Sequence, residues 1–245
     1  MPLAPDAYSP RPPGRLKYLF IRHALRFLLR CYLRVRLEGQ DRIPVDPPYL
    51  LNFSHPNWID PFLVTAFWPK RHFVFIFGPR EEDMGTGWRN RIIGWGELAV
   101  PFKPSKSDLI DTTRRAMAVF KAGYALGIAG EGRLSDREGE IVPLQDGAAF
   151  FALRGKVPVV PMAIIGTRWL RFGKQVTLRI GPLLSTEGMR ADRAGVDLLT
   201  GRLQAAMAEL LVGVQDERPP GPFGRWLTDV FNERPWLNDP ELEKD

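Results

Sequence analysis

The chain has 245 residues, 44% hydrophobic and 25% charged, with a formal net charge of +6. This length allows a substantial core, and the composition is that of a globular protein. One cysteine, Cys31, excludes a disulfide framework, and three scattered histidines offer no metal-ligand cluster, so we expect neither a metal nor a cofactor. No uncharged apolar run reaches the roughly 18 residues of a membrane-spanning helix. The Pro-rich start lacks the apolar centre of a signal peptide.

The first predicted element is a basic amphipathic helix. Residues 15–36 contain seven Lys or Arg and no acid. Arginines recur every four residues and form one stripe on a helix: Arg22, Arg26, Arg30 and Arg34. Apolar side chains gather on the other side: Leu16, Leu19, Phe20, Phe27, Leu28 and Cys31. Such a helix suits an anionic membrane surface, with the apolar face in the acyl boundary and the arginines at phosphates. The alternative is a helix packed on its own domain with a solvated arginine face. No nucleic-acid-binding motif accompanies the charge, so we expect no nucleic-acid partner.

Short apolar runs then alternate with amphipathic segments. The predicted strands are Leu33–Glu38, Tyr49–Phe53, His72–Phe77, Glu97–Phe102, Ala125–Ala129, Val157–Ile165 and Val176–Ile180. The predicted helices between them are Trp58–Phe67, Arg80–Ile93, Lys106–Ala122, Gly147–Leu153 and Ala194–Val212. This alternation predicts an α/β fold with a mostly parallel sheet flanked by helices.

A histidine and an aspartate share the turn that follows the second predicted strand, in the stretch SHPNWIDP, residues 54–61. An imidazole can take a proton from a hydroxyl when a carboxylate holds its other ring nitrogen. The four-residue gap lets the turn bring His55 and Asp60 into hydrogen-bond reach. A purely structural alternative also fits, because Asp60 before Pro61 is typical of a helix N-cap followed by proline.

A second candidate site is the glycine-rich stretch GIAGEGRLSDREGEI, residues 127–141. An apolar strand runs into Gly130, Glu131, Gly132 and Arg133. Glycines let the backbone approach a ligand closely, and the guanidinium fork of Arg133 matches a phosphate. The alternative is an ordinary turn that carries a surface ion pair.

Three stretches, in this order and spacing, resemble the glycerolipid acyltransferase family of the 1-acylglycerol-3-phosphate acyltransferase (lysophosphatidic acid acyltransferase) type. They are NFSHPNWIDPFLV (52–64), AGEGRLSDREGEI (129–141) and KVPVVPMAIIGT (156–167). The likeness runs from about Leu33 to Ser185. His55 and Asp60 match the first motif of the family, and residues 131–133 match the core of the third.

The resemblance implies transfer of a fatty acyl group from an acyl thioester, acyl-CoA or an acyl carrier protein, to a lysophospholipid hydroxyl. His55, oriented by Asp60, would deprotonate the acceptor. Arg133 and Gly132 would hold the acceptor phosphate, and Glu131 would fix Arg133 and the loop.

Two positions depart from the family pattern. Gly130 stands where proline is usual, and Phe102 with Lys103 stands where the second motif ends in an arginine. Lys103 would attract a phosphate without a planar fork. These departures keep two alternatives open: an acyltransferase with a different acceptor, and a membrane-surface lipid-binding protein without turnover.

The resemblance indicates an acyltransferase domain (33–213). The composition and charge pattern of the ends predict a disordered lead-in (1–14), an amphipathic membrane-associating helix (15–32) and a Pro-rich C-terminal extension (214–245). With the basic helix, the resemblance predicts a peripheral protein on the cytoplasmic face of a membrane.

Overall fold

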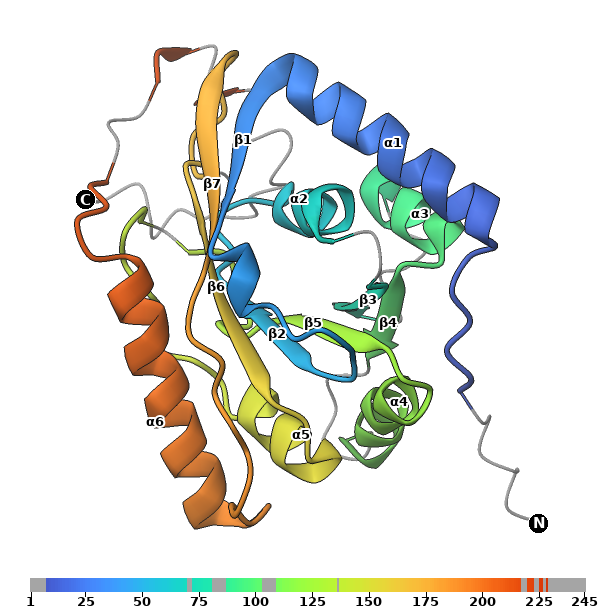
Figure 1. The fold of residues 1–245 in the computed structure, drawn as a ribbon. Helices are drawn as coiled ribbons and strands as arrows, with labels where there is room; N and C mark the ends of the chain where they lie inside the picture. Colours follow the sequence, from blue (N-terminus) through green and yellow to red (C-terminus); the bar gives the residue numbers. More distant parts are fainter. Residues whose placement is uncertain are drawn as a thin grey trace.

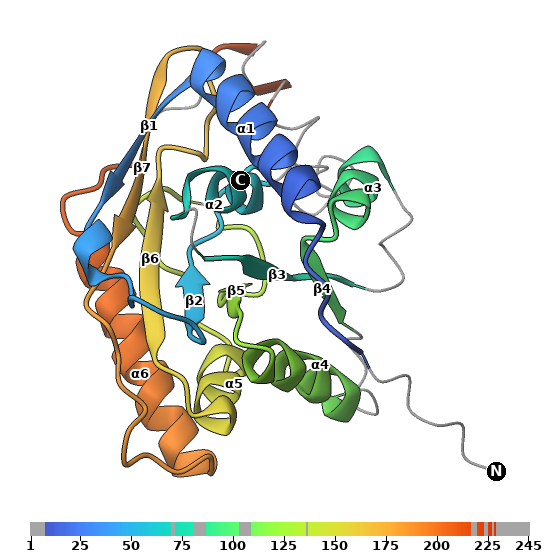
Figure 2. The same cartoon turned by 45° about the vertical axis from the view of Figure 1, so that its right-hand side comes forward.

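The computed structural model describes residues 8–69, 72–80, 87–102, 109–135, 137–216, 220–222, 225–226 and 228. Within these ranges a seven-stranded sheet is covered by helices on both faces (Figures 1 and 2). The strands are β1 (Leu33–Glu38), β2 (Leu50–Phe53), β3 (Val74–Arg80), β4 (Ala99–Phe102), β5 (Ala125–Ala129), β6 (Val159–Ile165) and β7 (Lys174–Ile180). The helices are α1 (Arg15–Tyr32), α2 (Asp60–Phe67), α3 (Gly87–Gly96), α4 (Leu109–Lys121), α5 (Gly147–Gly155) and α6 (Arg193–Leu210), and a 3₁₀ turn, η1 (Gln40–Arg42), follows β1.

The sheet is mostly parallel, as the alternation of strands and helices predicts. Its order is β1-β7-β6-β2-β5-β3-β4, and only the β6–β7 pair is antiparallel within it. The predicted strand positions are confirmed, with small shifts at their ends. The largest shift is at β3, which continues to Arg80, where a helix was expected to begin. Arg80 pairs with Phe102 after an irregularity in the ladder, so strand pairing extends β3 beyond its apolar run.

Two hydrophobic cores lie on opposite faces of the sheet. Helices α4, α5 and α6 cover one face, and α1, α2 and α3 lie on the other (Figures 1 and 2). Neighbouring residues of β2 point to different cores: Leu50 into the first and Leu51 into the second. Burial on both faces explains why β2 is apolar without alternation, as is usual for the central strands of a parallel sheet.

Helix α1 packs on the domain through Ile21, Leu25 and Leu29 together with part of its arginine stripe. Arg22 is 2% exposed and donates hydrogen bonds to the carbonyl oxygens of Thr65, at 3.2 Å, and Trp68. These carbonyls lie at the C-terminal end of α2, where helical carbonyls lack partners within the helix. Arg26 and Arg30 lie over the ring of Phe67, also at that end of α2. The expectation that the stripe points away from the domain is therefore wrong for Arg22, because the helix spacing does not show what the stripe packs against.

The opposite face of α1 is apolar and faces solvent. Four large side chains on it are between 62% and 83% exposed: Leu16, Phe20, Phe27 and Leu28. We call these four residues the α1 apolar face. Phe172, 79% exposed, lies beside the C-terminal end of the helix, with its ring 6.1 Å from that of Tyr32. None of the helices in the described ranges is long and apolar enough to cross a membrane.

The structure describes only part of the predicted N-terminal lead-in and of the predicted C-terminal extension. Residues 1–7 of the predicted lead-in and most of the predicted extension from 214 to 245 lie outside the described residues. Residues 8–14 have no regular secondary structure, and the ring of Tyr8 lies 5.8 Å from the guanidinium of Arg115 in α4.

Replacement of Arg22 by methionine should destabilise the protein. The change removes a buried, charge-assisted link to the end of α2, for which a loss of about 2 kcal/mol is expected. Urea unfolding measures the loss. The matched control is Arg34→Met, at an exposed arginine of β1, which should change stability by less than about 0.5 kcal/mol. Equal unfolding midpoints for the two variants would contradict the role assigned to Arg22.

Candidate active site

The candidate residues meet at the carboxyl edge of the parallel strands, where α/β proteins commonly place ligands. β2 ends at Phe53, which pairs with Ala129 at the end of β5 on one side and with Met162 of β6 on the other. Ser54 continues the link to β6: its N–H donates to the Met162 carbonyl at 3.1 Å, and its Oγ accepts from the Ile164 N–H at 2.8 Å. The turn that carries His55 is therefore fixed to two neighbouring strands.

His55 and Asp60 form a hydrogen-bonded pair. Nδ1 of His55 lies 3.0 Å from Oδ2 of Asp60; the imidazole is 20% exposed and the carboxylate is completely buried. With Nδ1–H donating to Asp60, the other ring nitrogen, Nε2, keeps a lone pair for a proton. The Asn57 N–H also donates to Oδ2, at 2.7 Å. Asp60 is the first residue of α2, after Ile59 at the N-cap, so the alternative that it only caps this helix is wrong.

The surroundings of Asp60 have two opposite effects on the pKa of its carboxyl group. Burial raises the pKa of Asp60, because the charged form loses water around it, while hydrogen bonds from His55 and the Asn57 backbone act in the lowering direction. The carboxylate is thus placed where its charge has few partners other than the imidazole. An ionised Asp60 is therefore the group that would stabilise an imidazolium formed during proton transfer.

Glu131 ties the glycine-rich loop to the His55 turn. Its Oε1 accepts from the His55 N–H at 3.3 Å, and its Oε2 accepts from the hydroxyl of Ser135. The Ser135 N–H in turn donates to the His55 carbonyl at 2.9 Å. Glu131 is 2% exposed, and burial raises its pKa. The carboxylate thus links the loop to the backbone of His55, a contact that the sequence does not indicate.

Close packing against a neighbouring side chain explains why position 130 is a glycine. A Cβ atom at Gly130 would lie 2.1 Å from Oδ1 of Asn52. Asn52 is completely buried in β2, next to the strand that leads into the loop. A side chain at 130 therefore conflicts with the amide, and this accounts for the departure from the proline usual in the family. Gly132 has φ +69°, a left-handed conformation that favours glycine.

One groove of about 1070 Å³ is lined by four of the candidate residues. His55, Glu131, Gly132 and Arg133 all line it, and the Arg133 side chain is exposed. Its other walls are mostly apolar, contributed by Phe53, Trp58, Phe62, Ile76, Phe77, Phe102, Ile128 and Phe151. Phe102 stacks on Phe77, with ring centroids 5.1 Å apart. Lys103 lies outside the described residues. The groove is thus lined by the imidazole of His55, the guanidinium of Arg133 and a long apolar wall.

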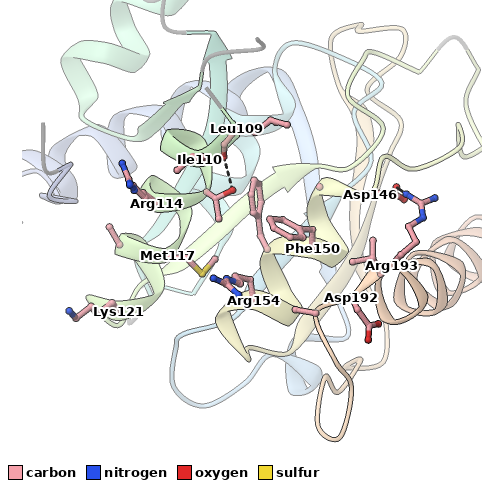
Figure 3. Close-up of a pocket in the computed structure, with 16 residues that line it drawn as sticks. Leu109, Ile110, Arg114, Met117, Lys121, Asp146, Phe150, Arg154, Asp192 and Arg193 are labelled. Carbon is pink, nitrogen blue, oxygen red and sulfur yellow. Dashed lines mark hydrogen bonds and ion pairs between the residues drawn. The ribbon is translucent and has the colours of Figure 1, made fainter. Parts of the chain in front are cut away.

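A second groove, of about 1030 Å³, lies between α4, α5 and the start of α6 (Figure 3). Leu109, Gly147 and Phe151 line both grooves, so the two adjoin. Arg114, Lys121 and Arg154 project around its apolar floor. None of the candidate residues lines this groove. In the described part of the chain, no group of three or more His, Cys, Asp or Glu side chains is placed to hold a metal ion.

Comparison with known proteins identifies the class. Residues 34–165 match the family described as Acyltransferase, which is more than half of the chain. The chain belongs to this family, as its motifs predict. The match includes His55, Asp60 and the 131–133 loop.

Two curated relatives carry more specific names. A 1-acyl-sn-glycerol-3-phosphate acyltransferase of Saccharomyces cerevisiae is 25% identical over 182 residues, 71% of this chain and 58% of the relative. A chloroplastic 1-acyl-sn-glycerol-3-phosphate acyltransferase of Brassica napus is 25% identical over 138 residues, 56% of this chain and 38% of the relative. The chain thus spans less than two thirds of the length of these relatives.

A solved structure shares the fold. The 1-acyl-sn-glycerophosphate (LPA) acyltransferase PlsC from Thermotoga maritima superposes with a TM-score of 0.61 at 19% identity. The match covers 81% of this chain and 78% of that chain. At this identity the likeness shows the common α/β architecture and nothing about substrates.

Proposed function

We propose that the protein is an O-acyltransferase that moves a fatty acyl group from an acyl thioester to the hydroxyl of a lysophospholipid, with 1-acylglycerol-3-phosphate as the acceptor. The observation that carries this proposal is the 3.0 Å contact between His55 Nδ1 and the buried Asp60 carboxylate, in a groove that Arg133 also lines. Membership of the acyltransferase family supports the reaction, and the names of the curated relatives support the acceptor.

The proposed chemistry is a general-base acyl transfer. Nε2 of His55 accepts the proton of the acceptor hydroxyl as its oxygen attacks the thioester carbonyl carbon, and Asp60 stabilises the imidazolium that forms. The tetrahedral intermediate then collapses: the C–S bond breaks and the thiolate takes up the proton from His55. The products are an ester and a free thiol, the thiol of coenzyme A or of an acyl carrier protein.

The acceptor phosphate would be held by Arg133. A guanidinium presents two parallel N–H groups to two phosphate oxygens, a contact that a lysine cannot reproduce. Gly132 leaves the backbone beside Arg133 open to the ligand, and the apolar walls of the groove suit the acyl chains. Lys103 keeps its predicted secondary part in attracting the phosphate.

We further propose that the α1 apolar face enters the membrane surface. Four large apolar side chains on one exposed helix face are typical of a helix that lies in the lipid interface. Trp95 of α3 extends this surface near the start of α1, with Lys17 5.2 Å above its ring. Anionic lipid attracts the surrounding basic residues. A peripheral position on the cytoplasmic face of a membrane follows from this proposal.

Replacement of His55 by alanine should abolish acyl transfer while the protein stays folded. Loss of a general base lowers the rate by about 10²- to 10⁴-fold, and Asp60→Asn should cost less, because the imidazole remains. Release of thiol from acyl-CoA, with detergent-dispersed lysophosphatidic acid, measures the rate. His23→Ala is the matched control, since His23 lies on an exposed side of α1. More than a tenth of the wild-type rate in His55→Ala would reject the mechanism, and a lipid-binding protein without turnover would release no thiol at all.

Replacement of Arg133 by lysine should raise the KM for lysophosphatidic acid about ten-fold or more, because a bidentate, charge-assisted contact is lost. The KM for the acyl donor should change little. Arg137→Lys is the control: this exposed arginine of the same loop pairs with Glu140. Competition between lysophosphatidic acid and a phosphate-free monoacylglycerol tests specificity. Equal use of both acceptors, unaffected by Arg133→Lys, would remove the phosphate contact from the mechanism and leave the reaction.

The double variant Phe20→Ser/Phe27→Ser should lose binding to vesicles that contain phosphatidylglycerol. Each phenylalanine buried in the acyl boundary contributes roughly 1.5–3 kcal/mol, so co-sedimentation should fall at least ten-fold. Leu198→Ser, on the half-exposed side of α6 across the sheet, is the control. Point substitutions are preferable to removal of α1, which would also remove Arg22. Unchanged co-sedimentation of the double variant would exclude the α1 apolar face as the contact.

A further inference from the structure

Two buried polar atoms next to each other lack a hydrogen-bond partner among the described residues. One is Oδ1 of Asp60, the carboxylate oxygen that does not bind His55, and the other is Oγ1 of Thr167. Both side chains are completely buried. Burial raises the pKa of Asp60, but the Thr167 hydroxyl lies near enough to act in the lowering direction as a hydrogen-bond donor. The two side chains therefore lie close enough to interact, although no hydrogen bond joins them in this structure. A hydroxyl can donate and an ionised carboxylate can only accept, so the two groups are complementary.

Thr167 is held in place by the turn between β6 and β7. The carboxylate of Glu138, itself 4% exposed, accepts from the Gly166 N–H at 2.5 Å and from the Arg168 N–H at 3.2 Å. These are the backbone groups on either side of Thr167. Gly166 has φ +92°, and a Cβ there would lie 2.5 Å from the Gln175 carbonyl, so the turn has little freedom. The position of the Thr167 side chain is thus set by its neighbours.

The same turn is connected to the turn of His55. Ile164, three residues before Thr167, is bound to Ser54 through its N–H, and Ser54 directly precedes His55. Thr167 and His55 therefore approach Asp60 from two strands that are fixed to each other.

Three buried carboxylates in this region need donors. The charges of Glu131 and Glu138 both act against that of Asp60, and Lys174 lies near Glu138 with the opposite sign. Glu131 receives the hydroxyl of Ser135, and Glu138 receives two backbone N–H groups. Among the residues described here, Asp60 has hydrogen-bond donors only at Oδ2. A hydroxyl at Oδ1 would give each carboxylate oxygen a donor.

We propose that Thr167 is a positioning residue for the acyl transfer: its hydroxyl donates to Oδ1 of Asp60 and so keeps Oδ2 directed at Nδ1 of His55. With donors at one oxygen only, the carboxylate can rotate about its Cβ–Cγ bond and loosen the imidazole. With a donor at each oxygen, the plane of the carboxylate is fixed. This inference rests on the proposed function, since it assigns a role within the same base.

Kinetics of Thr167→Val and Thr167→Ser test the role in the reaction. Valine keeps the shape and removes the hydroxyl, so kcat should fall about ten-fold or more, with both KM values unchanged. Serine keeps the hydroxyl and should retain most of the rate. Thr177→Val, at a similarly buried threonine of β7, is the matched control. In a His55→Ala background, Thr167→Val should cause no further loss, because Thr167 acts only through His55.

An NMR measurement tests the positioning without any activity. The chain has three histidines, so ¹⁵N-histidine labelling gives three ring systems, and His55→Ala identifies that of His55. Above the pH at which it titrates, wild-type His55 should be a single tautomer with the proton on Nδ1. Thr167→Val should show a mixture of tautomers and Thr167→Ser the wild-type form.

The two experiments separate the failure of this inference from that of the proposed function. If the wild-type protein transfers no acyl group but Thr167→Val changes the tautomer, the positioning stands and the reaction is wrong. A wild-type tautomer in Thr167→Val overturns the inference. So does an equal loss of rate in the valine and serine variants, or a Thr167→Val loss that persists in the His55→Ala background, because each indicates a packing effect.

Discussion

The buried carboxylate of Asp60 is the group on which the site depends. A charge without water is costly unless hydrogen-bond donors surround it, and here the donors come from a histidine and from a backbone amide that precede it in the same turn. These two hydrogen bonds hold residues 55–60 in a compact turn, because both donors lie within five residues of Asp60. The contact with Asp60 holds the imidazole of His55, and its second ring nitrogen, Nε2, stays available in the groove.

The site is assembled from segments that the sheet brings together rather than from one motif. The His55 turn follows β2, the Glu131 loop follows β5, and the Thr167 turn follows β6, three strands that lie side by side. Short hydrogen-bonded links join them: Glu131 and Ser135 hold the loop to His55, and Ser54 holds the turn to β6. The Asn52 and Gly130 pair shows the same interdependence, because the amide occupies the space that a side chain at 130 would need.

Helix α1 connects the surface of the protein to the helix that carries Asp60. Arg22 of its basic stripe turns inward and binds the C-terminal carbonyls of α2, while Asp60 stands at the first turn of that helix. Ile21 and Leu29 are buried on the same side of α1, whereas the four residues of the α1 apolar face point outward, so the helix has apolar side chains on two sides. A membrane contact at the α1 apolar face would hold the groove at a defined orientation to the lipid from which the acceptor comes.

The sequence by itself determined the class of fold and the family, and it indicated the main candidate groups of the site. Alternating apolar runs and amphipathic segments predict the order of strands and helices, and two short motifs contain His55, Asp60 and residues 131–133. These features can be read from the sequence because each is local in the chain. The tertiary structure alone decided the rest. It shows which way α1 faces, that Asp60 binds the imidazole instead of capping its helix, that Glu131 reaches the backbone of His55, and that Glu138 and Thr167 belong to the surroundings of Asp60. Apart from the contact of Asp60 with His55, which spans five residues, these features depend on contacts between residues far apart in the sequence, such as the 76 positions that separate His55 from Glu131. Hydrophobic periodicity does not predict such contacts. It indicates which side chains are buried, but not which residues pack against them.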